Sequence, residues 1–297
     1  MSVDGLVVVD KPTGCTSHDV VGRLRRVYSQ RRVGHAGTLD PDATGVLLVG
    51  LGRATRLLRF LQETSKTYRA TVVFGVATDS LDASGAVLDR VAMRLTRRQI
   101  EAAATGFVGT SEQVPPMVSA IKIGGRRLHE LARAGVEVER PPRPIRIDRF
   151  DVESFTDGAY PEAGVVVDCS SGTYIRSLAA DLGVALGGCA HLRDLRRFRV
   201  GAFDVTAART LPDIEADPDA AVLTPAEAMR ALPRLTVAGE EQRAVCHGAV
   251  FAAAALPAAG DSSGPFAVVD DDGNLLAVYE RRGAALRGSV VMVGGDT

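Results

Sequence analysis

Hydrophobic and polar positions along the chain follow two repeating patterns, one typical of strands and one typical of helices. Residues 5–10 (GLVVVD) and 45–50 (GVLLVG) are short apolar runs, which predict buried strands. Residues 66–76 (KTYRATVVFGV) alternate, with Tyr68 on the apolar face, which predicts a strand with one buried face. Residues 18–28 carry apolar side chains at helical spacing after Ser17, which we expect to cap this helix.

The middle of the chain continues this mixture of helices and strands. Capping boxes that begin at Thr96 and Thr224 each predict a helix. Residues 165–188 indicate a strand, a turn and then a helix with a continuous apolar stripe. Residues 193–203 (RDLRRFRVGAF) form a basic segment that is strand-like in its second half. These patterns predict both helices and strands in this part of the chain.

A change of composition divides the chain into two predicted domains. Residues 211–220 are rich in proline and aspartate, which is typical of a connection. We place the domains at residues 1–231 and 232–297, because 297 residues suffice for about two domains. Within the second domain, residues 266–280 (FAVVDDDGNLLAVYE) predict a β-hairpin.

Composition is that of a soluble globular protein, with 46% hydrophobic and 24% charged residues. No apolar run has the length that a bilayer requires, and the N-terminal segment lacks the features of a signal peptide. We therefore expect a cytoplasmic protein with no membrane partner. Its four cysteines and five histidines form no disulfide, zinc or metalloprotease pattern, so no metal site is predicted.

The net charge of −1 conceals an uneven distribution of charge. Residues 1–210 contain 29 basic and 23 acidic residues, whereas residues 211–297 contain 6 and 13. The first part can therefore face a polyanion, and residues 118–147, with seven basic against three acidic residues, indicate a basic, partly mobile insertion. Arginine outnumbers lysine by 32 to 3, which suits contacts with phosphates and bases, but a bias toward arginine codons is the simpler explanation of that ratio.

Residues 34–45 (GHAGTLDPDATG) are the stretch richest in chemical groups. Glycines at 34, 37 and 45 permit positive φ or close approach of another segment, and Pro41 disfavours a helical conformation at Asp40. We therefore expect a loop, held between two buried strands, that presents the Asp40 carboxylate. A carboxylate in such a position can act as a nucleophile or as a base.

Two other interpretations of Asp40 remain open at this point. An Asp-Pro pair can simply start a turn. The run Asp40-Pro41-Asp42-Ala43-Thr44 also matches the D-x-D-x-T motif of aspartyl-phosphate phosphatases. That motif normally ends a hydrophobic strand, and its magnesium ion would need further acidic ligands that the sequence does not identify.

Four segments of the chain form a distinctive combination: DKPTGCTSHDVV (10–21), GHAGTLDPDATGVLLV (34–49), KTYRA (66–70) and SSGTYIRSLAADLG (170–183). Together they resemble the TruB-type tRNA pseudouridine synthases, which isomerise uridine-55 in the T loop. Residues 113–147 are similar to the RNA-gripping insertion of that family, and HLRDLRRFRVG, which ends at Gly201, is similar to its last catalytic-domain motif. The resemblance covers most of the first 210 residues.

This resemblance implies an α+β fold, with a catalytic domain around a central, mainly antiparallel sheet and a small β-rich, PUA-like C-terminal module. It implies no metal and no organic cofactor. Asp40 would be the nucleophile that attacks a flipped-out uridine at the base or at the sugar, and Arg176 would pair with it and keep it ionised. Tyr68 would stack against the target uracil, in addition to being an inward-facing strand residue.

Other residues are assigned to substrate binding by the same resemblance. Tyr174 and Leu195 would line the base pocket, and His35 would occupy space near the displaced base, although each could also be an ordinary core or turn residue. Lys11 would support the catalytic loop or contact phosphate. Basic side chains of the insertion would contact the tRNA backbone; they are Lys122, Arg126, Arg127, Arg133, Arg140, Arg143 and Arg146.

The expected partner is therefore tRNA, through its T loop and T arm, bound by a monomeric protein. The C-terminal module carries five basic and eight acidic residues, which weakens the case for strong phosphate binding there. A non-catalytic tRNA-binding folding chaperone is the main alternative, because it would use the same basic surface without needing Asp40.

Overall fold

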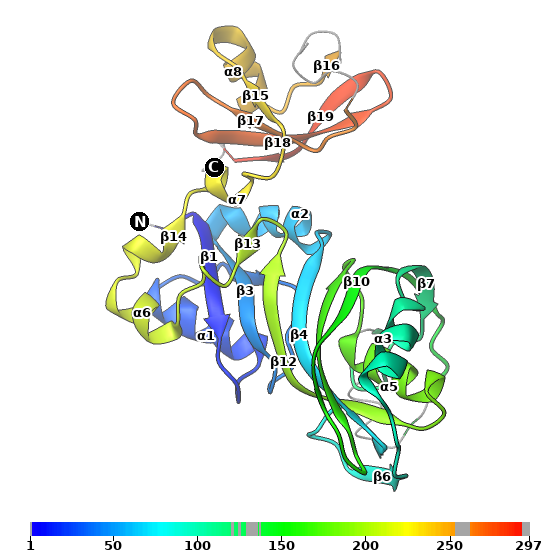
Figure 1. The fold of residues 1–297 in the computed structure, drawn as a ribbon. Helices are drawn as coiled ribbons and strands as arrows, with labels where there is room; N and C mark the ends of the chain where they lie inside the picture. Colours follow the sequence, from blue (N-terminus) through cyan, green and yellow to red (C-terminus); the bar gives the residue numbers. More distant parts are fainter. Residues whose placement is uncertain are drawn as a thin grey trace.

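Two separate β-sheets form the framework of the protein (Figure 1). The computed structural model describes residues 2–119, 122–123, 126–128, 136, 138–252 and 262–292. The larger sheet has ten strands and the smaller, C-terminal sheet has five. Strands β5 (Val76–Thr78) and β6 (Val87–Arg90) form an additional hairpin.

The main sheet has the strand order β14-β1-β3-β12-β4-β11-β10-β7. Neighbouring strands are antiparallel, except that β12 and β3 run parallel. This confirms the predicted mixed fold around a mainly antiparallel sheet. The strands are β1 (Gly5–Lys11), β2 (Val33–Ala36), β3 (Thr44–Leu51), β4 (Lys66–Phe74), β7 (Gly109–Gln113), β10 (Arg143–Thr156), β11 (Glu162–Cys169), β12 (Ala190–Val200), β13 (Phe203–Asp204) and β14 (Val222–Leu223).

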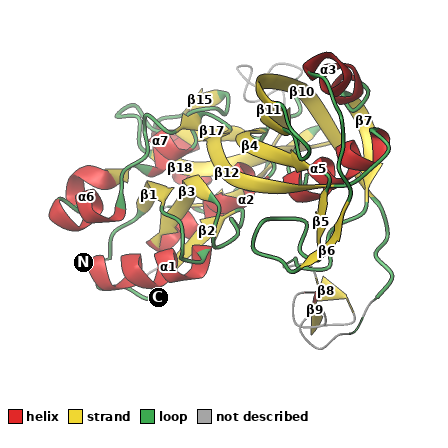
Figure 2. Ribbon diagram, turned by 60° about the horizontal axis from the view of Figure 1, so that its bottom comes forward, coloured by secondary structure: helices red, strands yellow, loops and turns green. Residues whose placement is uncertain are grey.

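Helices pack on the two ends of the main sheet (Figure 2). Helices α1 and α6 cover β1 and β3 through one apolar cluster, and α3 and α5 cover β4, β10 and β11 through another. A short 3-10 turn (Gly52–Leu57) leads into α2. The helices are α1 (Ser17–Val27), α2 (Leu58–Gln62), α3 (Arg97–Thr105), α5 (Ile175–Ala185), α6 (Leu211–Ala216), α7 (Pro225–Ala228) and α8 (Gly239–Cys246).

The start of α1 differs from the prediction by one residue. Thr16, and not Ser17, is the N-cap, and it forms a capping box with Asp19. Ser17 is instead the first residue of the helix and is buried. The prediction was wrong because both residue types favour N-caps, and the sequence alone does not reveal that the hydroxyl of Ser17 is needed elsewhere.

The segment with arginines at 193, 196, 197 and 199 is strand β12 over its whole length, and β12 is central in the sheet. Its many charged residues obscured the strand in the sequence. One face of β12 is solvated, where Arg196 pairs with Asp10 at 2.7 Å, whereas Arg197 on the other face is fully buried. A strand of this kind has no apolar run to indicate it.

The C-terminal sheet contains the predicted hairpin, formed by β17 and β18. Helix α8 packs against β18 and β19. Arg53 and Arg56, which follow β3, donate to the carbonyls of Met292 and Val291 at 2.8 and 2.9 Å and so link the first sheet to the second. The strands are β15 (Arg234–Thr236), β16 (Phe251–Ala252), β17 (Phe266–Val269), β18 (Leu275–Arg282) and β19 (Ala285–Val291).

Candidate active site

The loop that carries Asp40 connects β2 to β3, and its backbone depends on two glycines. Gly37 has φ +82° and Gly45 has φ +101°, conformations that disfavour any residue with a Cβ. A Cβ at Gly45 would also overlap the backbone carbonyl of Arg197 in β12. Both positions were expected to need glycine, whereas Gly34 lies within β2 and does not adopt positive φ.

Buried side chains from two other elements hold this loop on both sides of Asp40. The hydroxyl of Ser17 donates to the carbonyl of Leu39 at 3.1 Å and accepts from its N–H at 2.8 Å. Lys11 Nζ donates to the carbonyl of Pro41 at 2.9 Å and to the carbonyls of Pro12 and Cys15. The residues before and after Asp40 are therefore fixed by groups that are shielded from water.

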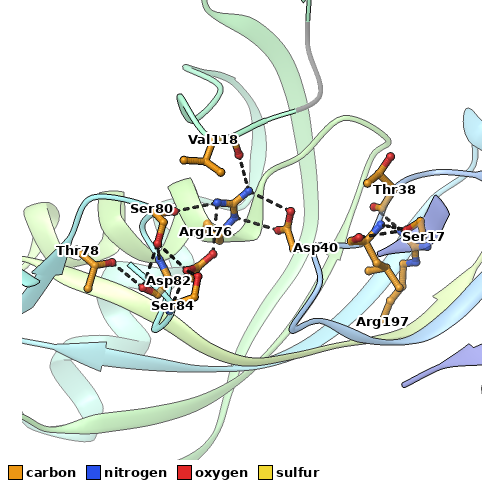
Figure 3. A network of polar contacts seen from close by, with 11 residues as sticks. Ser17, Thr38, Asp40, Thr78, Ser80, Asp82, Ser84, Val118, Arg176 and Arg197 are labelled. Atoms are coloured by element: carbon orange, nitrogen blue, oxygen red, sulfur yellow. Dashed lines mark hydrogen bonds and ion pairs between the residues drawn. The ribbon is translucent and has the colours of Figure 1, made fainter. Parts of the chain in front are cut away.

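Arg197 on β12 forms a third attachment. Its Nε donates to the carbonyl of Val46 at 2.8 Å, and its two terminal nitrogens donate to the carbonyls of Thr38 and Gly37 at 3.4 and 3.1 Å. It is 1% exposed, so these bonds form in a low-dielectric interior, where each is electrostatically stronger than in water. Arg197 thus ties the start of β3 to the beginning of the loop that carries Asp40 (Figure 3).

Asp40 faces Arg176, which comes from the first turn of α5 (Figure 3). Arg176 Nε lies 3.1 Å from Asp40 Oδ2, and a terminal nitrogen lies 3.3 Å from Oδ1, so the contact is bidentate. Asp82 lies on the other side of the guanidinium, 3.3 Å from Nη1. Carbonyls of Ser80 and Val118 accept at 2.8 and 2.7 Å, so the Arg176 side chain is held from several directions.

Asp82 is itself fixed by the loop between β5 and β6. Its Oδ1 accepts from the hydroxyls of Ser80 and Ser84 at 2.6 Å each, and from the N–H of Ser84 at 3.1 Å. The hydroxyl of Thr78 donates to the Asp82 carbonyl at 2.7 Å. The position of Arg176, and through it that of Asp40, is therefore set by a preorganised loop far away in the sequence.

Burial raises the pKa of Asp40 above the ordinary value for aspartate. The charge of Arg176 lowers this pKa but does not cancel the effect of desolvation, and the charge of Asp82 raises it further. The sequence led us to expect only the effect of the arginine. A raised pKa makes the carboxylate more basic and more reactive than an exposed aspartate once it has lost its proton.

Two cavities meet at Asp40, and Arg176 and Leu195 also line both of them. One, of about 390 Å³, is walled by Tyr68 and Tyr174, which the resemblance assigned to the base pocket. The other, of about 220 Å³, lies beside Asp82, Ser80 and Ser84. The structure thus brings together five predicted site residues, namely Asp40, Tyr68, Tyr174, Arg176 and Leu195.

The other predicted site residues do not line the two cavities or lie outside the described residues. His35 is on β2 and lines neither cavity, and its Nδ1 has no hydrogen-bond partner among the described residues. Lys11 is fully buried and uses its N–H groups on carbonyls, which favours loop support over phosphate contact. Most of the insertion, including the side chains of Lys122, Arg126 and Arg127, lies outside the described residues.

Sequence reasoning missed Asp82, Lys66, Ser17 and Arg197 as members of this site. Asp82 lies in a Ser/Asp-rich turn, which is a common surface sequence, and nothing in its spacing relates it to Asp40. Lys66 and Arg197 stand at strand positions where a buried cation is rare. One sequence feature could have identified Lys66: it is an isolated lysine at the start of a segment whose alternating positions are otherwise apolar.

No group of three or more His, Cys, Asp or Glu side chains that could hold a metal ion occurs in the part of the chain that the structure describes. Within the same residues, no helix is long and apolar enough to cross a membrane. The principal groups of the site are the Asp40 carboxylate, the guanidinium of Arg176 and the aromatic rings of Tyr68 and Tyr174.

Solved structures share this architecture. A chain in the structure of an H/ACA RNP bound to a substrate RNA containing 2′-deoxyuridine matches 98% of this chain over 86% of its own length, with TM-score 0.74 and 25% identity. A chain in the crystal structure of a Cbf5-Nop10-Gar1 complex matches 98% of this chain over 84% of its length, with TM-score 0.73 and 26% identity. The fold of this chain therefore recurs, over 98% of its length, in chains of these two complexes.

Sequence comparisons make the class specific. The profile of the TruB family pseudouridylate synthase N-terminal domain matches residues 25–175, and that of the tRNA pseudouridylate synthase B C-terminal domain matches residues 176–237. The class of protein is thus a pseudouridylate synthase, an isomerase that acts on RNA.

Relatives identify the family within this class. Proteins called tRNA pseudouridine synthase B from Mycolicibacterium paratuberculosis and Mycobacterium avium are 46% and 47% identical, covering 98% of this chain and 98% and 97% of their own lengths. The protein of the same name from Rhodococcus jostii is 44% identical over 97% of this chain and 93% of its own. This chain belongs to the TruB family of pseudouridylate synthases.

Proposed function

We propose that this protein isomerises uridine-55 in the T loop of tRNA to pseudouridine, with Asp40 as the nucleophile. The observation that carries the proposal is the position of Asp40 where two cavities meet, with its carboxylate gripped by Arg176 and with Tyr68 on the wall of the larger cavity. Curated relatives called tRNA pseudouridine synthase B support tRNA as the substrate.

The larger cavity suits a flipped-out nucleoside. Its volume of about 390 Å³ falls in the range of roughly 300–1,000 Å³ for small-ligand pockets. Tyr68 and Tyr174 offer aromatic surface for stacking, which is how unpaired RNA bases are commonly held. The reacting atoms of a uridine are enclosed within the folded T loop, so the base has to leave its stack to reach this cavity.

Asp40 would then attack either C6 of the base or C1′ of the sugar, and the bond between C1′ and N1 breaks. The uracil turns, C5 bonds to C1′, and the bond to Asp40 breaks, which regenerates the carboxylate. The proton on C5 is lost to solvent and N1 takes up a proton. Arg176 would orient the carboxylate and favour its ionised form through the bidentate contact. No other reactant is required, because the reaction is an isomerisation.

Binding of the tRNA body is assigned to the basic face around the insertion, where Arg143 and Arg146 at the start of β10 are exposed. A tRNA substrate also implies a cytoplasmic protein, and we propose that it acts as a monomer. The acidic C-terminal sheet would contribute shape rather than strong phosphate contacts.

Mapping of the product tests this proposal. Unmodified tRNA transcript is incubated with the protein, digested, and analysed by mass spectrometry after chemical labelling of pseudouridine. We expect a single pseudouridine, at position 55 of the T loop. Pseudouridine at another position would refute the site of modification, and binding without any pseudouridine would indicate the folding chaperone instead.

A further inference from the structure

The loop that carries Asp40 is surrounded by more buried cations than its ion pair with Arg176 requires. Four lysine and arginine side chains are buried among the described residues: Lys11, Lys66, Arg176 and Arg197. All four either bond to the catalytic loop or line a cavity at Asp40. Of these four, only Arg176 forms an ion pair with a carboxylate in the described part of the chain.

Lys66 and Arg197 form one side of the larger cavity. Lys66 begins β4, two residues before Tyr68, and is 6% exposed. A Cβ placed on Gly37 would lie 3.5 Å from a terminal nitrogen of Arg197 and 3.8 Å from Lys66 Cε, so the two side chains converge over this glycine. Both line the cavity that Tyr68 and Asp40 also line.

Lys66 retains an N–H donor that no described residue accepts. Its Nζ donates to the carbonyls of Gln62 and Thr64 at 2.9 and 3.1 Å, at the end of α2. An ammonium group has three N–H donors, and the third has no acceptor among the described residues. Glu63 also lines the cavity, but no ion pair joins it to Lys66.

The base acquires negative charge during the reaction, whichever route Asp40 takes. Breaking the bond between C1′ and N1 leaves its electron pair on uracil, where O2 and O4 share the charge. Attack at C6 instead moves electrons through the C5–C6 bond toward O4. A fixed positive group in a site shielded from water stabilises such charge far more than water-exposed groups do.

We propose that Lys66, supported by Arg197, is a catalytic residue of the base pocket that stabilises the negative charge on a uracil carbonyl oxygen. The proposal rests on the proposed function, because it needs uridine in the larger cavity. The two sides of Asp40 then have different roles. Arg176 holds the nucleophile, and Lys66 stabilises the negative charge that the reaction places on the base.

The charge on Lys66 itself should be visible in the pH dependence. Burial, with a contribution from the neighbouring Arg197 on β12, lowers the pKa of Lys66 to about 8. Cys169 on β11 also faces it, and burial raises the pKa of that thiol to about 11. Lys66 therefore loses its proton as the pH rises through about 8, while the Cys169 thiol keeps its own proton.

The test compares the wild-type protein with Lys66→Met and Lys66→Arg on a T-arm RNA labelled with tritium at uracil C5. For Lys66→Met we expect a single-turnover rate roughly 100-fold lower, the usual effect of removing one such donor, with RNA affinity within about threefold. Arg97→Met is the matched control. Arg97 lies on α3, away from both cavities, and donates to the carbonyl of Val152 at 2.8 Å. Loss of Arg97 should therefore leave the rate unchanged.

The profile of kcat/KM against pH, which reports groups of the free enzyme, is the second measurement and needs no methionine variant. We expect it to fall above about pH 8 in the wild type and to stay level in Lys66→Arg, whose side chain remains charged. Parallel profiles of the wild type and Lys66→Arg would overturn the proposal.

An unchanged single-turnover rate in Lys66→Met would also overturn it. Weaker binding at an unchanged rate would mean that Lys66 contacts the RNA backbone. Absence of release by the wild type would instead overturn the proposed function.

Discussion

The two sides of the cleft at Asp40 differ in how their cations are balanced. On one side, Arg176 lies between Asp40 and Asp82, at 3.1 and 3.3 Å, so that two carboxylates share one guanidinium. On the other side, Arg197 and Lys66 bond to backbone carbonyls, and among the described residues no ion pair joins either of them to a carboxylate. The first side is compensated, whereas the second keeps its positive charge.

This difference has a cost that structural needs alone do not explain. Buried cations without a counter-charge are unfavourable, and carbonyl dipoles compensate them only in part. An apolar residue in the place of Lys66 would avoid this penalty, whereas Arg197 also anchors the loop that carries Asp40 through its bonds to the carbonyls of Gly37 and Thr38. An uncompensated positive region beside a compensated carboxylate is what a reaction requires when an anionic nucleophile pushes electrons onto the substrate.

Replacement of Arg176 by methionine should have the largest effect on the compensated side. The change leaves Asp40 facing Asp82 without a cation, so the pKa of Asp40 should rise further. We expect kcat to fall about 100- to 1,000-fold, which corresponds to about 3 to 4 kcal/mol. Single-turnover tritium release measures the rate, and filter binding of the same RNA measures affinity.

Arg176→Lys is the matched variant, because it keeps the charge but loses the fork that reaches both carboxylates. A substantial loss in Arg176→Lys as well would show that geometry matters in addition to charge. If Arg176→Met kept near wild-type kcat, the compensated side would not hold the nucleophile, and the assignment of Arg176 would be wrong.

Asp82→Asn should have a smaller and more specific effect. The charge of Asp82 raises the pKa of Asp40, so its removal should lower that pKa. Asp40 is active when ionised, and the acid limb of the kcat/KM profile should therefore move to lower pH, the opposite direction from Arg176→Met. We expect the rate at neutral pH to fall by about tenfold, because the anchor of Arg176 is weakened. A shift of the acid limb to higher pH would contradict this account.

The sequence predicted the strands and helices whose patterns are regular. Residues 5–10, 45–50 and 66–76 became β1, β3 and the β4–β5 segment, and Thr96 and Thr224 cap α3 and α7 as expected. Asp40 was recognisable because glycine and proline around it have clear conformational meanings. Its pairing with Arg176 came from the resemblance alone, since 136 residues separate them.

What the sequence did not reveal are contacts that depend on how distant segments meet. Arg197 lies in a run of arginines, and only the register of β12 against β4 and β3 decides that it is buried while Arg196 is half-exposed. In the sequence, Lys66 resembles the polar start of a strand. In the structure it is buried, because its ammonium group bonds to a carbonyl at the end of α2. A pattern in one segment carries no information about such neighbours.

Asp40 is the proposed nucleophile, and the variant Asp40→Asn examines this role without changing the shape of the side chain. Asparagine has the same shape and can still hydrogen-bond to Arg176, but it is neither charged nor nucleophilic. Tritium release from T-arm RNA labelled at uracil C5 is followed for both proteins at saturating concentration. The account predicts release by the wild type and none above background by Asp40→Asn, with RNA affinity preserved. Equal release by the two proteins would contradict it.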